Sequence, residues 1–286
     1  MPSICAIVVT FNRINILKEN IENIFSQSLK ISHLIVVDNG SSDGTLDYLK
    51  SHENPNLSLV SLDENLGFGA GLQKGMSYAQ INFEPDYYWL LDDDSYPSSD
   101  LLKFIYFKSL EIDSIGIYGL SGYLHKKGIP KRPEKTISGY QIVDFVLVDN
   151  ALIPCEIVNI IGFVSPDFFM MCEDYEYCQR AKDFGFPVYI LFSENEELVN
   201  RLHLGSQKNS TSLIWRGYYH TRNHILILKQ YYSNKKLIGL INRHFKIILH
   251  ALIFGPYRLK KFRYRILGLW HGLIGVKGKT IDPKNF

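Results

Sequence analysis

Short apolar, β-branched runs alternate with amphipathic stretches through the first hundred residues. The runs predict strands at residues 4–10, 34–37, 57–62 and 87–91. Between them, apolar residues at helical spacing predict helices at residues 14–25, 45–50 and 69–79. Repeated strand–helix steps are typical of a parallel sheet with crossover helices, so we expect a doubly wound α/β architecture.

The pattern changes after Asp100. A helix to about residue 111 is followed by short segments punctuated by Gly and Pro through Pro154, which predict mixed or antiparallel strands in the same sheet. A helix at residues 174–184 and a strand at residues 187–192 come next. Three helical segments follow at residues 211–232, 235–254 and 257–274. We therefore expect one α/β domain in residues 1–232 and a helical extension in residues 233–286.

Charge divides the chain at nearly the same place. The 286 residues carry a net charge of only +2 and are 46% hydrophobic, enough for a substantial core. From Lys229 onward, thirteen Lys or Arg stand against the single acid Asp282, which leaves a net charge of about −10 before Lys229. The molecule is therefore expected to have an acidic body and a basic tail.

The chain has no sequence features of a secreted or membrane-spanning protein. None of the four cysteines stands in a CxxC pair, and no basic segment followed by an apolar leader opens the sequence. The longest apolar stretch, residues 238–254, is interrupted by Arg243, His244, Lys246 and His250, and falls short of the roughly 18 apolar residues of a spanning helix. We expect a reduced, cytoplasmic protein without a transmembrane segment.

One apolar strand ends in three carboxylates, Asp92, Asp93 and Asp94. In open α/β sheets, ligands bind beyond the carboxyl ends of the strands. Adjacent carboxylates repel one another, and a hard divalent cation that prefers oxygen ligands would neutralise them. In an extended segment, Asp92 and Asp94 face one ligand while Asp93 faces elsewhere. The alternative is a solvated acidic turn that caps the next helix.

Polar residues also follow the first two strands. Thr10, Asn12 and Arg13 come after the first, and Asp38 and Asn39 open a turn of sequence DNGSSDGT after the second. Asp38 can accept a hydrogen bond from a base or a ribose, and the turn offers backbone amides. The alternative is an ordinary turn whose second aspartate caps the next helix.

The glycine-rich run NLGFGAG, which contains Asn65 and Gly67, leads into a helix. Its glycines allow a ligand to approach the backbone closely. It lacks the dinucleotide G-x-G-x-x-G spacing after the first strand, and no Walker lysine follows. Neither an NAD site nor a P-loop is therefore expected.

The motifs TFNR, VVDNGSSDGT, ENLGFGAG and WLLDDDS, in this order and at these separations, resemble those of the family 2 glycosyltransferases. WLLDDD is most similar to the galactofuranosyltransferase and rhamnosyltransferase-like branches, and the resemblance extends to about residue 230. It implies the GT-A fold, a Rossmann-like, open, mostly parallel sheet flanked by helices. It also implies that Asp92 and Asp94 of the DXD element bind Mn²⁺ or Mg²⁺. The residues that it assigns to the nucleotide sugar are Thr10, Asn12, Arg13, Asp38, Asn39, Asn65, Gly67, Asp92 and Asp93.

The second half supplies the segments NAL, IGF and FFMMCEDYEYCQR. In the family, the ED pair opens a helix beneath the acceptor pocket and its aspartate is the general base. By matching position, the resemblance assigns that role to Asp174, beside Glu173. From the residues alone, both are first-turn acids that favour the helix dipole.

Two further elements match the family. His203 corresponds to a histidine that completes the metal or diphosphate site in many relatives, and a neutral imidazole favours manganese over magnesium. The alternative is a half-buried polar residue between two leucines. Arg222 and Asn223 match an element that braces the active-site loop, and the alternative there is a helix surface.

The tail combines apolar and basic residues at helical spacing. A stripe is formed by Leu237, Ile241, Phe245, Ile248 and Leu252, and residues 257–270 repeat the mixture. Such helices lie in a membrane interface and favour anionic lipid, with about 1 kcal/mol per basic residue. The alternative is a helical pair that packs on the domain or on another subunit. Nucleic acid is not expected, because the body is acidic.

Together these features predict an inverting, metal-dependent hexosyltransferase. Displacing a nucleoside diphosphate needs a base for the acceptor hydroxyl and a cation for the leaving phosphate, and a single base opposite the leaving group implies inversion. We expect a UDP- or dTDP-sugar donor, first UDP-galactofuranose or another UDP-hexose. The acceptor would be a lipid-diphosphate-linked glycan of bacterial surface polysaccharide or capsule, at the inner face of the membrane. The rivals are a nucleotidyltransferase and a non-catalytic, membrane-associated sugar-nucleotide-binding scaffold.

Overall fold

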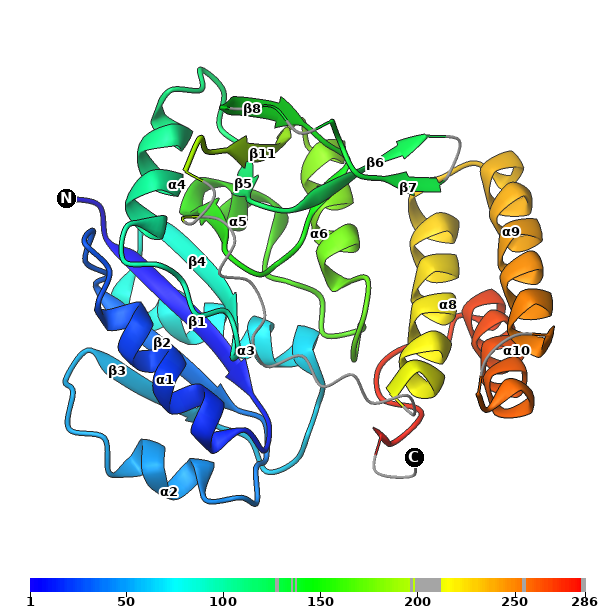
Figure 1. Cartoon of the computed structure of the whole chain (residues 1–286), viewed down its shortest axis with the longest axis horizontal. Helices are drawn as coiled ribbons and strands as arrows, with labels where there is room; N and C mark the ends of the chain where they lie inside the picture. The colour runs from blue at the N-terminus through cyan, green and yellow to red at the C-terminus, as the bar shows by residue number, and fades with distance from the viewer. Residues whose placement is uncertain are drawn as a thin grey trace.

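The computed structural model describes residues 1–126, 129–134, 136, 138–195, 198, 212–253 and 256–283. It contains a layered α/β body and three long helices at one end (Figure 1). The last part of the chain returns to the junction between the body and these helices.

The first half forms four parallel strands and three helices. The strands are β1 (Ile4–Thr10), β2 (His33–Asp38), β3 (Leu57–Ser61) and β4 (Tyr87–Asp92). The helices are α1 (Ile14–Phe25), α2 (Thr45–Lys50) and α3 (Phe68–Phe83). Every element predicted for this half is present, and α3 continues about one turn further than predicted.

Helices cover both faces of the sheet, because side chains alternate along each strand. In β1, Ala6 and Val8 belong to the core on the side of α1 and α4, whereas Ile7 and Val9 belong to the core on the side of α3. The remaining helices of the body are α4 (Leu101–Leu110), α5 (Cys155–Ile161) and α6 (Glu173–Asp183). Of these, α5 was not predicted.

The central sheet has eight strands in the order β3-β2-β1-β4-β10-β5-β11-β8. Its later strands are β5 (Ile117–Gly119), β8 (Gly139–Ile142), β10 (Ala151–Pro154) and β11 (Val188–Phe192). Because β10 runs antiparallel to β4 and β5, and β8 to β11, the prediction of antiparallel strands in this sheet is confirmed. A small separate sheet, which was not predicted, contains β6 (Gly122–Lys126), β7 (Ile129–Lys131) and β9 (Phe145–Val146).

Three helices complete the described chain: α8 (Ser212–Tyr231), α9 (Asn234–Ile253) and α10 (Arg258–Ile274). Small residues let α10 lie close along α8, since a Cβ at Gly268 would stand 2.5 Å from the carbonyl oxygen of Tyr218. Helix α8 also contacts the body, where the Tyr231 hydroxyl donates to Glu176 of α6 over 2.5 Å. It therefore joins the body to α10, on the body side of the expected boundary at residue 233.

The apolar stripe predicted in α9 does not form one exposed face. Ile248 is fully buried beside His244, while Phe245, Leu249 and Ile253 are exposed. The reason is that α9 packs against α8, so the exposed apolar face is displaced around the helix. Within the described residues, every helix is too short or too polar to cross a membrane.

Candidate active site

The carboxyl ends of β1, β2 and β4 bring three polar loops together. Parallel pairing places Thr10 opposite Asp38 and Val9 opposite Asp92. Since β1 lies between β2 and β4, its loop at Arg13 has the other two loops on either side. Residues about eighty positions apart in the chain thus meet at one edge of the sheet, where α/β folds bind ligands.

Arg13 holds two of the three triplet carboxylates. Its Nη1 lies 2.7 Å from Oδ1 of Asp93 and 3.1 Å from Oδ2 of Asp94, and the Thr10 hydroxyl donates to Asp93 over 3.0 Å. The chain turns directly after Asp92. The expectation that Asp93 faces away from Asp94 is therefore wrong, because it assumed that the extended strand continues through the triplet.

Burial and ion pairing act against each other in this cluster. Burial raises the pKa of Asp93, and attraction to Arg13 offsets only part of that rise. Burial also disfavours the charged guanidinium, but the two carboxylates overcome this effect and raise the pKa of Arg13. The protein thus already supplies one cation to the triplet.

Three polar residues support the turn of the triplet, and the sequence reasoning missed them. The fully buried Asn20 of α1 donates from Nδ2 to the carbonyl oxygen of Asp92 over 2.9 Å and accepts from the backbone N–H of Tyr96 over 3.1 Å. The Ser95 hydroxyl donates to Asp149, whose Oδ1 also accepts from the backbone N–H of Asp92. Asn20 interrupts the apolar stripe of its helix, a signal that could have identified it.

Asp38 keeps an open acceptor at this edge. It is almost fully buried, its Oδ1 accepts from the backbone N–H of Ser41 over 3.2 Å, and its Oδ2 has no hydrogen-bond partner among the described residues. A buried carboxylate oxygen without a donor is costly, and a ligand hydroxyl or N–H would satisfy it. Asp43 does not occupy the N-cap of α2, where Gly44 stands; it accepts instead from the backbone N–H groups of Thr45 and Ile14.

Asn12 and Asn39 hold loops in place. The amide oxygen of Asn12 accepts from the backbone N–H of Ser42 over 2.7 Å. Asn39 donates to the carbonyl oxygen of Gly67 over 3.1 Å and accepts from the backbone N–H of Leu66 over 2.9 Å. The amide nitrogen and oxygen of Asn39 are both engaged, so this side chain fixes the glycine-rich loop.

The glycine-rich run packs against the segment that precedes Glu173. Gly67 has φ +93°, and a Cβ there would lie 2.2 Å from the carbonyl oxygen of Phe169. The same oxygen accepts from the backbone N–H of Phe68 over 2.8 Å, and the side chain of Asn65 accepts from the N–H of Gly67 over 2.9 Å. The loop at Asn65 and the segment before Glu173 are thus in direct contact.

Glu173 and Asp174 open α6 and form a second acidic cluster. Burial and then the neighbouring Asp174 raise the pKa of Glu173 well above its usual range, and the Asp92 carboxylate adds to the effect. Burial likewise raises the pKa of Asp174 to about 6. Acids in a first helical turn are normally stabilised in their charged form, so burial outweighs the helix dipole here.

Asn223 fixes the backbone that enters this helix. Its Nδ2 donates to the carbonyl oxygens of Met170 and Met171 over 2.9 and 2.7 Å. Met171 and Cys172 have φ values of 70° and 69°, in the left-handed region that disfavours side chains. The structure thus shows Asn223 bracing the segment in front of Asp174, as the family element implied.

Arg222 contacts the end of the described chain rather than this loop directly. Its Nη1 donates to the carbonyl oxygen of Gly278 over 2.7 Å and to the Thr280 hydroxyl over 2.9 Å. Gly278 in turn donates from its backbone N–H to the carbonyl oxygen of Asp167 over 2.8 Å. Arg222 therefore reaches the loop through residues 278–280, and also through Asn223, whose Oδ1 accepts from the Nε of Arg222 over 2.8 Å.

The described residues contain no group of three His, Cys, Asp or Glu side chains placed to hold a metal ion. His203, the expected third ligand, lies outside the described residues. The oxygen donors at the end of β4 still match the preference of Mg²⁺ and Mn²⁺, ions that complete their coordination with substrate phosphates.

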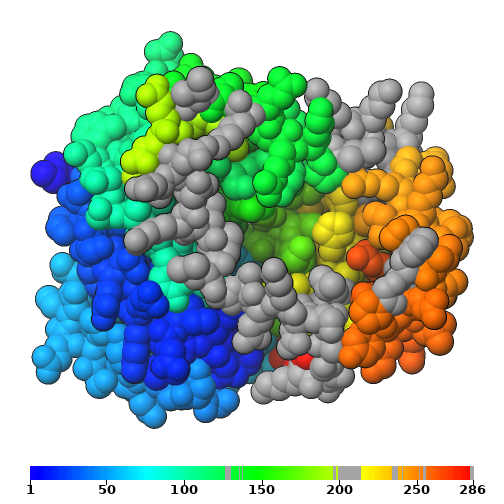
Figure 2. All heavy atoms as spheres, viewed as in Figure 1, coloured from blue at the N-terminus to red at the C-terminus, as the bar shows by residue number. Residues whose placement is uncertain are grey.

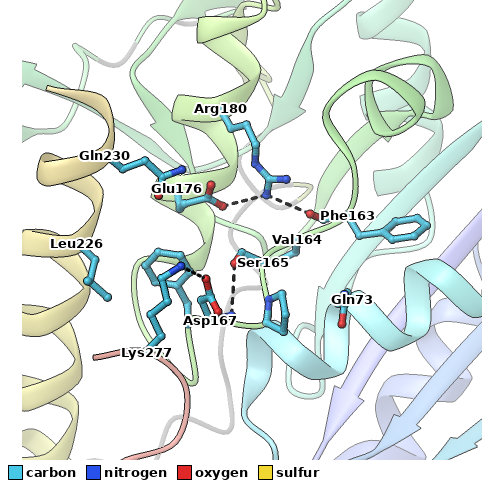
Figure 3. Close-up of a pocket in the computed structure, with 12 residues that line it drawn as sticks. Gln73, Phe163, Val164, Ser165, Asp167, Glu176, Arg180, Leu226, Gln230 and Lys277 are labelled. Carbon is cyan, nitrogen blue, oxygen red and sulfur yellow. Dashed lines mark hydrogen bonds and ion pairs between the residues drawn. The ribbon is translucent and has the colours of Figure 1, made fainter. Parts of the chain in front are cut away.

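A separate cavity of about 330 Å³ lies between α3, α6 and α8 (Figure 3). Its charged side chains are paired with each other: Arg180 with Glu176 over 2.9 Å, and Lys277 with Asp167 over 2.6 Å. None of the residues that the sequence assigned to the nucleotide sugar lines it. This cavity therefore lies apart from the residues that the sequence assigned to the donor.

The family model for Glycosyl transferase family 2 matches residues 5–157. The galactofuranosyltransferase GlfT1 of Mycolicibacterium smegmatis is 36% identical over 95 residues, which are 33% of this chain and 31% of the relative. The cholesterol galactosyltransferase of Borreliella burgdorferi is 30% identical over 105 residues, which are 36% of this chain and 28% of the relative. The matches thus span less than a third of the length of these two relatives.

Two solved structures share the fold. The mannosyltransferase PcManGT from Pyrobaculum calidifontis, in complex with GDP-Man and Mn²⁺, aligns over 99% of this chain and 78% of its own, with a TM-score of 0.61 and 15% identity. S. aureus TarS 1-349, in complex with UDP-GlcNAc, aligns over 96% of this chain and 81% of its own, with a TM-score of 0.55 and 17% identity. The expected GT-A fold is confirmed, and because the family model covers more than half of the residues, the chain belongs to glycosyl transferase family 2.

Proposed function

We propose that this protein is an inverting glycosyltransferase that moves a hexose from a nucleotide sugar to a glycan acceptor. The observation that supports this most is the pair of acidic clusters at one edge of the sheet. One contains the triplet of the family motif, and the other contains Asp174, whose pKa of about 6 suits a base that works near neutral pH. A metal-binding group and a separate base are the two parts that the reaction requires.

In this proposal the loops after β1 and β2 seat the nucleotide. Asp38 accepts from the base or ribose through the oxygen that has no donor in the described residues. Asp92 and Asp94 hold Mn²⁺ or Mg²⁺, with His203 as a further ligand. A cation held there would supply positive charge for the leaving diphosphate. Arg13 keeps Asp93 and Asp94 together.

Asp174 takes the proton from the acceptor hydroxyl in a single displacement. The hydroxyl oxygen forms its bond to the anomeric carbon while the bond from that carbon to the nucleoside diphosphate breaks. Glu173 is buried beside Asp174 and has one carboxylate oxygen without a partner in the described residues. The Asp92 carboxylate helps to raise the pKa of Glu173. We propose that Glu173 lies between the bound acceptor and the bound donor.

The donor is a UDP-hexose, with UDP-galactofuranose first and dTDP-rhamnose next. This choice is supported by the form of the triplet motif and by two similar proteins that carry galactofuranosyl- and galactosyltransferase names. The acceptor is a lipid-diphosphate-linked glycan in bacterial surface polysaccharide synthesis. Such an acceptor would require the enzyme at the inner face of the cell membrane.

Residues 233–286 provide the membrane contact. Exposed apolar residues follow one face of α9 and one face of α10; they are Ile238, Phe245, Leu249, Ile253, Leu259, Ile266, Trp270 and Leu273. Exposed Lys246, Arg258 and Lys260 lie on the same helices. Apolar and basic residues together favour an anionic bilayer surface over bulk water.

A thermal-shift screen tests the active site. UDP, dTDP, GDP and CDP are each added with and without Mn²⁺, because a ligand that binds only the native state raises the melting temperature. We expect a shift with UDP that depends on Mn²⁺. If none of the four nucleotides shifts the melting temperature, the protein is better explained as a scaffold that has lost donor binding.

Liposome flotation tests the membrane contact. The protein truncated after Tyr232, and full-length Phe245→Gln and Trp270→Gln, are mixed at low salt with vesicles that contain phosphatidylglycerol. All three should bind less than the wild type. If the substitutions leave vesicle binding unchanged but abolish self-association, the apolar faces form a subunit contact instead.

A further inference from the structure

Three histidine rings pack together where α8 meets α9. The ring centroids of His220, His224 and His244 are separated by 5.5, 5.9 and 5.3 Å, and Nε2 of His244 lies 3.2 Å from Nδ1 of His224. His125 of β6 extends the group, 6.5 Å from His224. His224 and His244 are buried, whereas His220 is partly exposed at the edge of the cluster. None of these residues has a role in the proposed transfer reaction.

The charged groups that face the three rings are cationic. Burial, then Arg265 and Arg243, lower the pKa of His220 to about 4. His244 shows the same order of effects, with burial first and His220 and the two arginines after it. Of the four histidines, Asp144 raises the pKa of His125 alone, and Asp144 is itself paired with Lys182 over 2.9 Å. The rings of α8 and α9 are therefore neutral donors beside two guanidinium groups.

Arg265 of α10 lies over the exposed edge of this cluster. Its guanidinium is 3.3 Å from the position of a Cβ at Gly217, and its Nη1 lies 3.4 Å from the Thr221 hydroxyl. Burial lowers its pKa, and no carboxylate raises it again. Among the described residues, Arg13 and Arg180 form ion pairs with carboxylates, whereas Arg265 forms none. A half-buried guanidinium in this position is stabilised by an anion.

The chemistry of the cluster favours an anion over a metal ion. Three imidazoles suggest a metal site, but no group of described residues is placed to hold one, and two neighbouring arginines repel a cation. Guanidinium forks and imidazole N–H groups are the donors that bind phosphate oxygens well. The cluster thus offers several donors to a phosphate.

The position of the cluster indicates what carries the phosphate. Arg243, Arg265 and His220 are partly exposed, and they belong to α8, α9 and α10. Two of these helices also carry exposed apolar side chains, among them Ile266 next to Arg265 and Leu249 one turn and a half from Arg243. Figure 2 shows α9 and α10, in orange, together at one end of the molecule. A molecule with a phosphate group and an apolar chain matches both features.

We propose that Arg265, Arg243 and His220 form a binding site for the diphosphate of a lipid carrier. The guanidinium groups contact the phosphate oxygens, and the apolar faces of α9 and α10 lie against the hydrocarbon. Binding of the anion follows from the cluster itself, while its assignment to the lipid that carries the acceptor glycan rests on the proposed function.

Isothermal titration with farnesyl diphosphate, a short isoprenoid diphosphate, tests the site. The titration is done in EDTA and saturating UDP, so that the metal-dependent donor site does not contribute. Arg265→Gln should weaken binding at least tenfold, and Arg265→Lys should recover most of it. The matched control is Arg263→Gln, an exposed arginine two residues away on α10, which should stay within twofold of the wild type. Equal affinities for Arg265→Gln and the wild type would overturn the proposal.

Two further probes separate the sources of the phosphate. Pyrophosphate lacks the hydrocarbon and should bind at least tenfold more weakly than farnesyl diphosphate, while farnesol lacks the phosphates and should not respond to Arg265→Gln. If pyrophosphate binds as tightly as farnesyl diphosphate, the lipid assignment is wrong and the site takes a free anion. If vesicles with phosphatidylglycerol compete fully, the ligand is a membrane headgroup instead of a carrier.

The donor site provides the control for the proposed function. The Mn²⁺-dependent shift of the melting temperature by UDP should be the same in Arg265→Gln and the wild type, because Arg265 lies outside the sheet edge. If the wild type shows no such shift but binds farnesyl diphosphate through Arg265, the proposed function fails and the phosphate site stands. If the wild type shows the shift but Arg265→Gln does not change the binding of farnesyl diphosphate, the proposed function stands and the phosphate site fails.

Discussion

The two acidic clusters at the sheet edge have different electrostatic surroundings. Asp93 and Asp94 share the guanidinium of Arg13, which reaches them from the loop after β1. Glu173 and Asp174 take part in none of the ion pairs among the described residues, and burial raises the pKa of both. Burial raises the pKa of Asp93 as well, but the attraction to Arg13 offsets part of that rise, whereas no ion pair among the described residues offsets it for Glu173 and Asp174.

This difference corresponds to two tasks in the proposed reaction. The triplet would hold a ligand that brings positive charge, and Asp174, whose pKa burial raises to about 6, would take the proton of the acceptor. The glycine run at Gly67 touches the segment that leads into α6 at Phe169.

The largest expected effect comes from Asp174→Asn. We expect kcat to fall by about 10²–10⁴-fold, since this is the usual contribution of a general base. The Mn²⁺-dependent thermal shift with UDP should persist, because the triplet is unchanged. The control is Asp183→Asn, at the other end of α6. Near-normal turnover with intact donor binding would show that Asp174 is not the base.

Arg13→Gln should remove the cation that Asp93 and Asp94 share. Removing the shared cation leaves Asp93 and Asp94 buried together, and the free energy of unfolding should fall by about 2 kcal/mol, less than for a fully buried pair because Arg13 is partly exposed. Mn²⁺ should restore more stability to this variant than to the wild type, and Arg13→Lys should lose less. Urea denaturation with EDTA or Mn²⁺ measures both effects. An unchanged midpoint in EDTA would contradict the proposed role of Arg13.

The pH dependence sharpens the comparison at Asp174. The base is active when deprotonated, so kcat should fall about tenfold per unit as the pH drops below about 6 and should level off above it. Because the folded pKa lies above the unfolded one, the stabilising effect of this group is present at low pH and lost as the pH rises through about 6. Asp174→Asn should therefore raise the melting temperature more at pH 8 than at pH 4. A kcat profile without this limb would leave the base unassigned.

The smallest expected effect comes from Asn223→Ala, which tests the support of the α6 cluster. The variant leaves the carbonyl oxygens of Met170 and Met171 without their donor, and the free energy of unfolding should fall by about 1 kcal/mol. We expect kcat to decrease severalfold while the affinity for UDP changes little, because the triplet does not depend on this contact. A change confined to UDP affinity would contradict the assignment.

The sequence predicted the layout of the first half closely because its signals are local. Apolar runs and helical spacing identified β1 to β4 and α1 to α3, since these patterns depend on which face of each element is buried. The acids of the triplet stand at a strand end for the same reason. By contrast, α5 and the small sheet of β6, β7 and β9 were missed. Their segments are short and are stabilised mainly by packing against the rest of the fold.

The site was predicted as a set of residues but not as a set of contacts. The family resemblance named Arg13, Asn39 and Gly67 for the nucleotide sugar, whereas in the structure Arg13 pairs with the triplet and Asn39 ties the Gly67 loop. Asn20 and Asp149, which support the turn of the triplet, carry no motif of their own. No spacing rule links them to Asp92, because they lie far from it in the chain.

The sequence by itself therefore determined the α/β class, the family and the placement of acids at strand ends. Periodicity records which side of an element is apolar, and ordered motifs record ancestry. Only the tertiary structure decided that Arg13 joins Asp93 to Asp94, that Glu173 is buried beside Asp174, and that Arg265 lies against Gly217 and Thr221 of another helix. These outcomes depend on polar atoms of distant segments meeting at hydrogen-bond distance, where burial and neighbouring charge set each pKa.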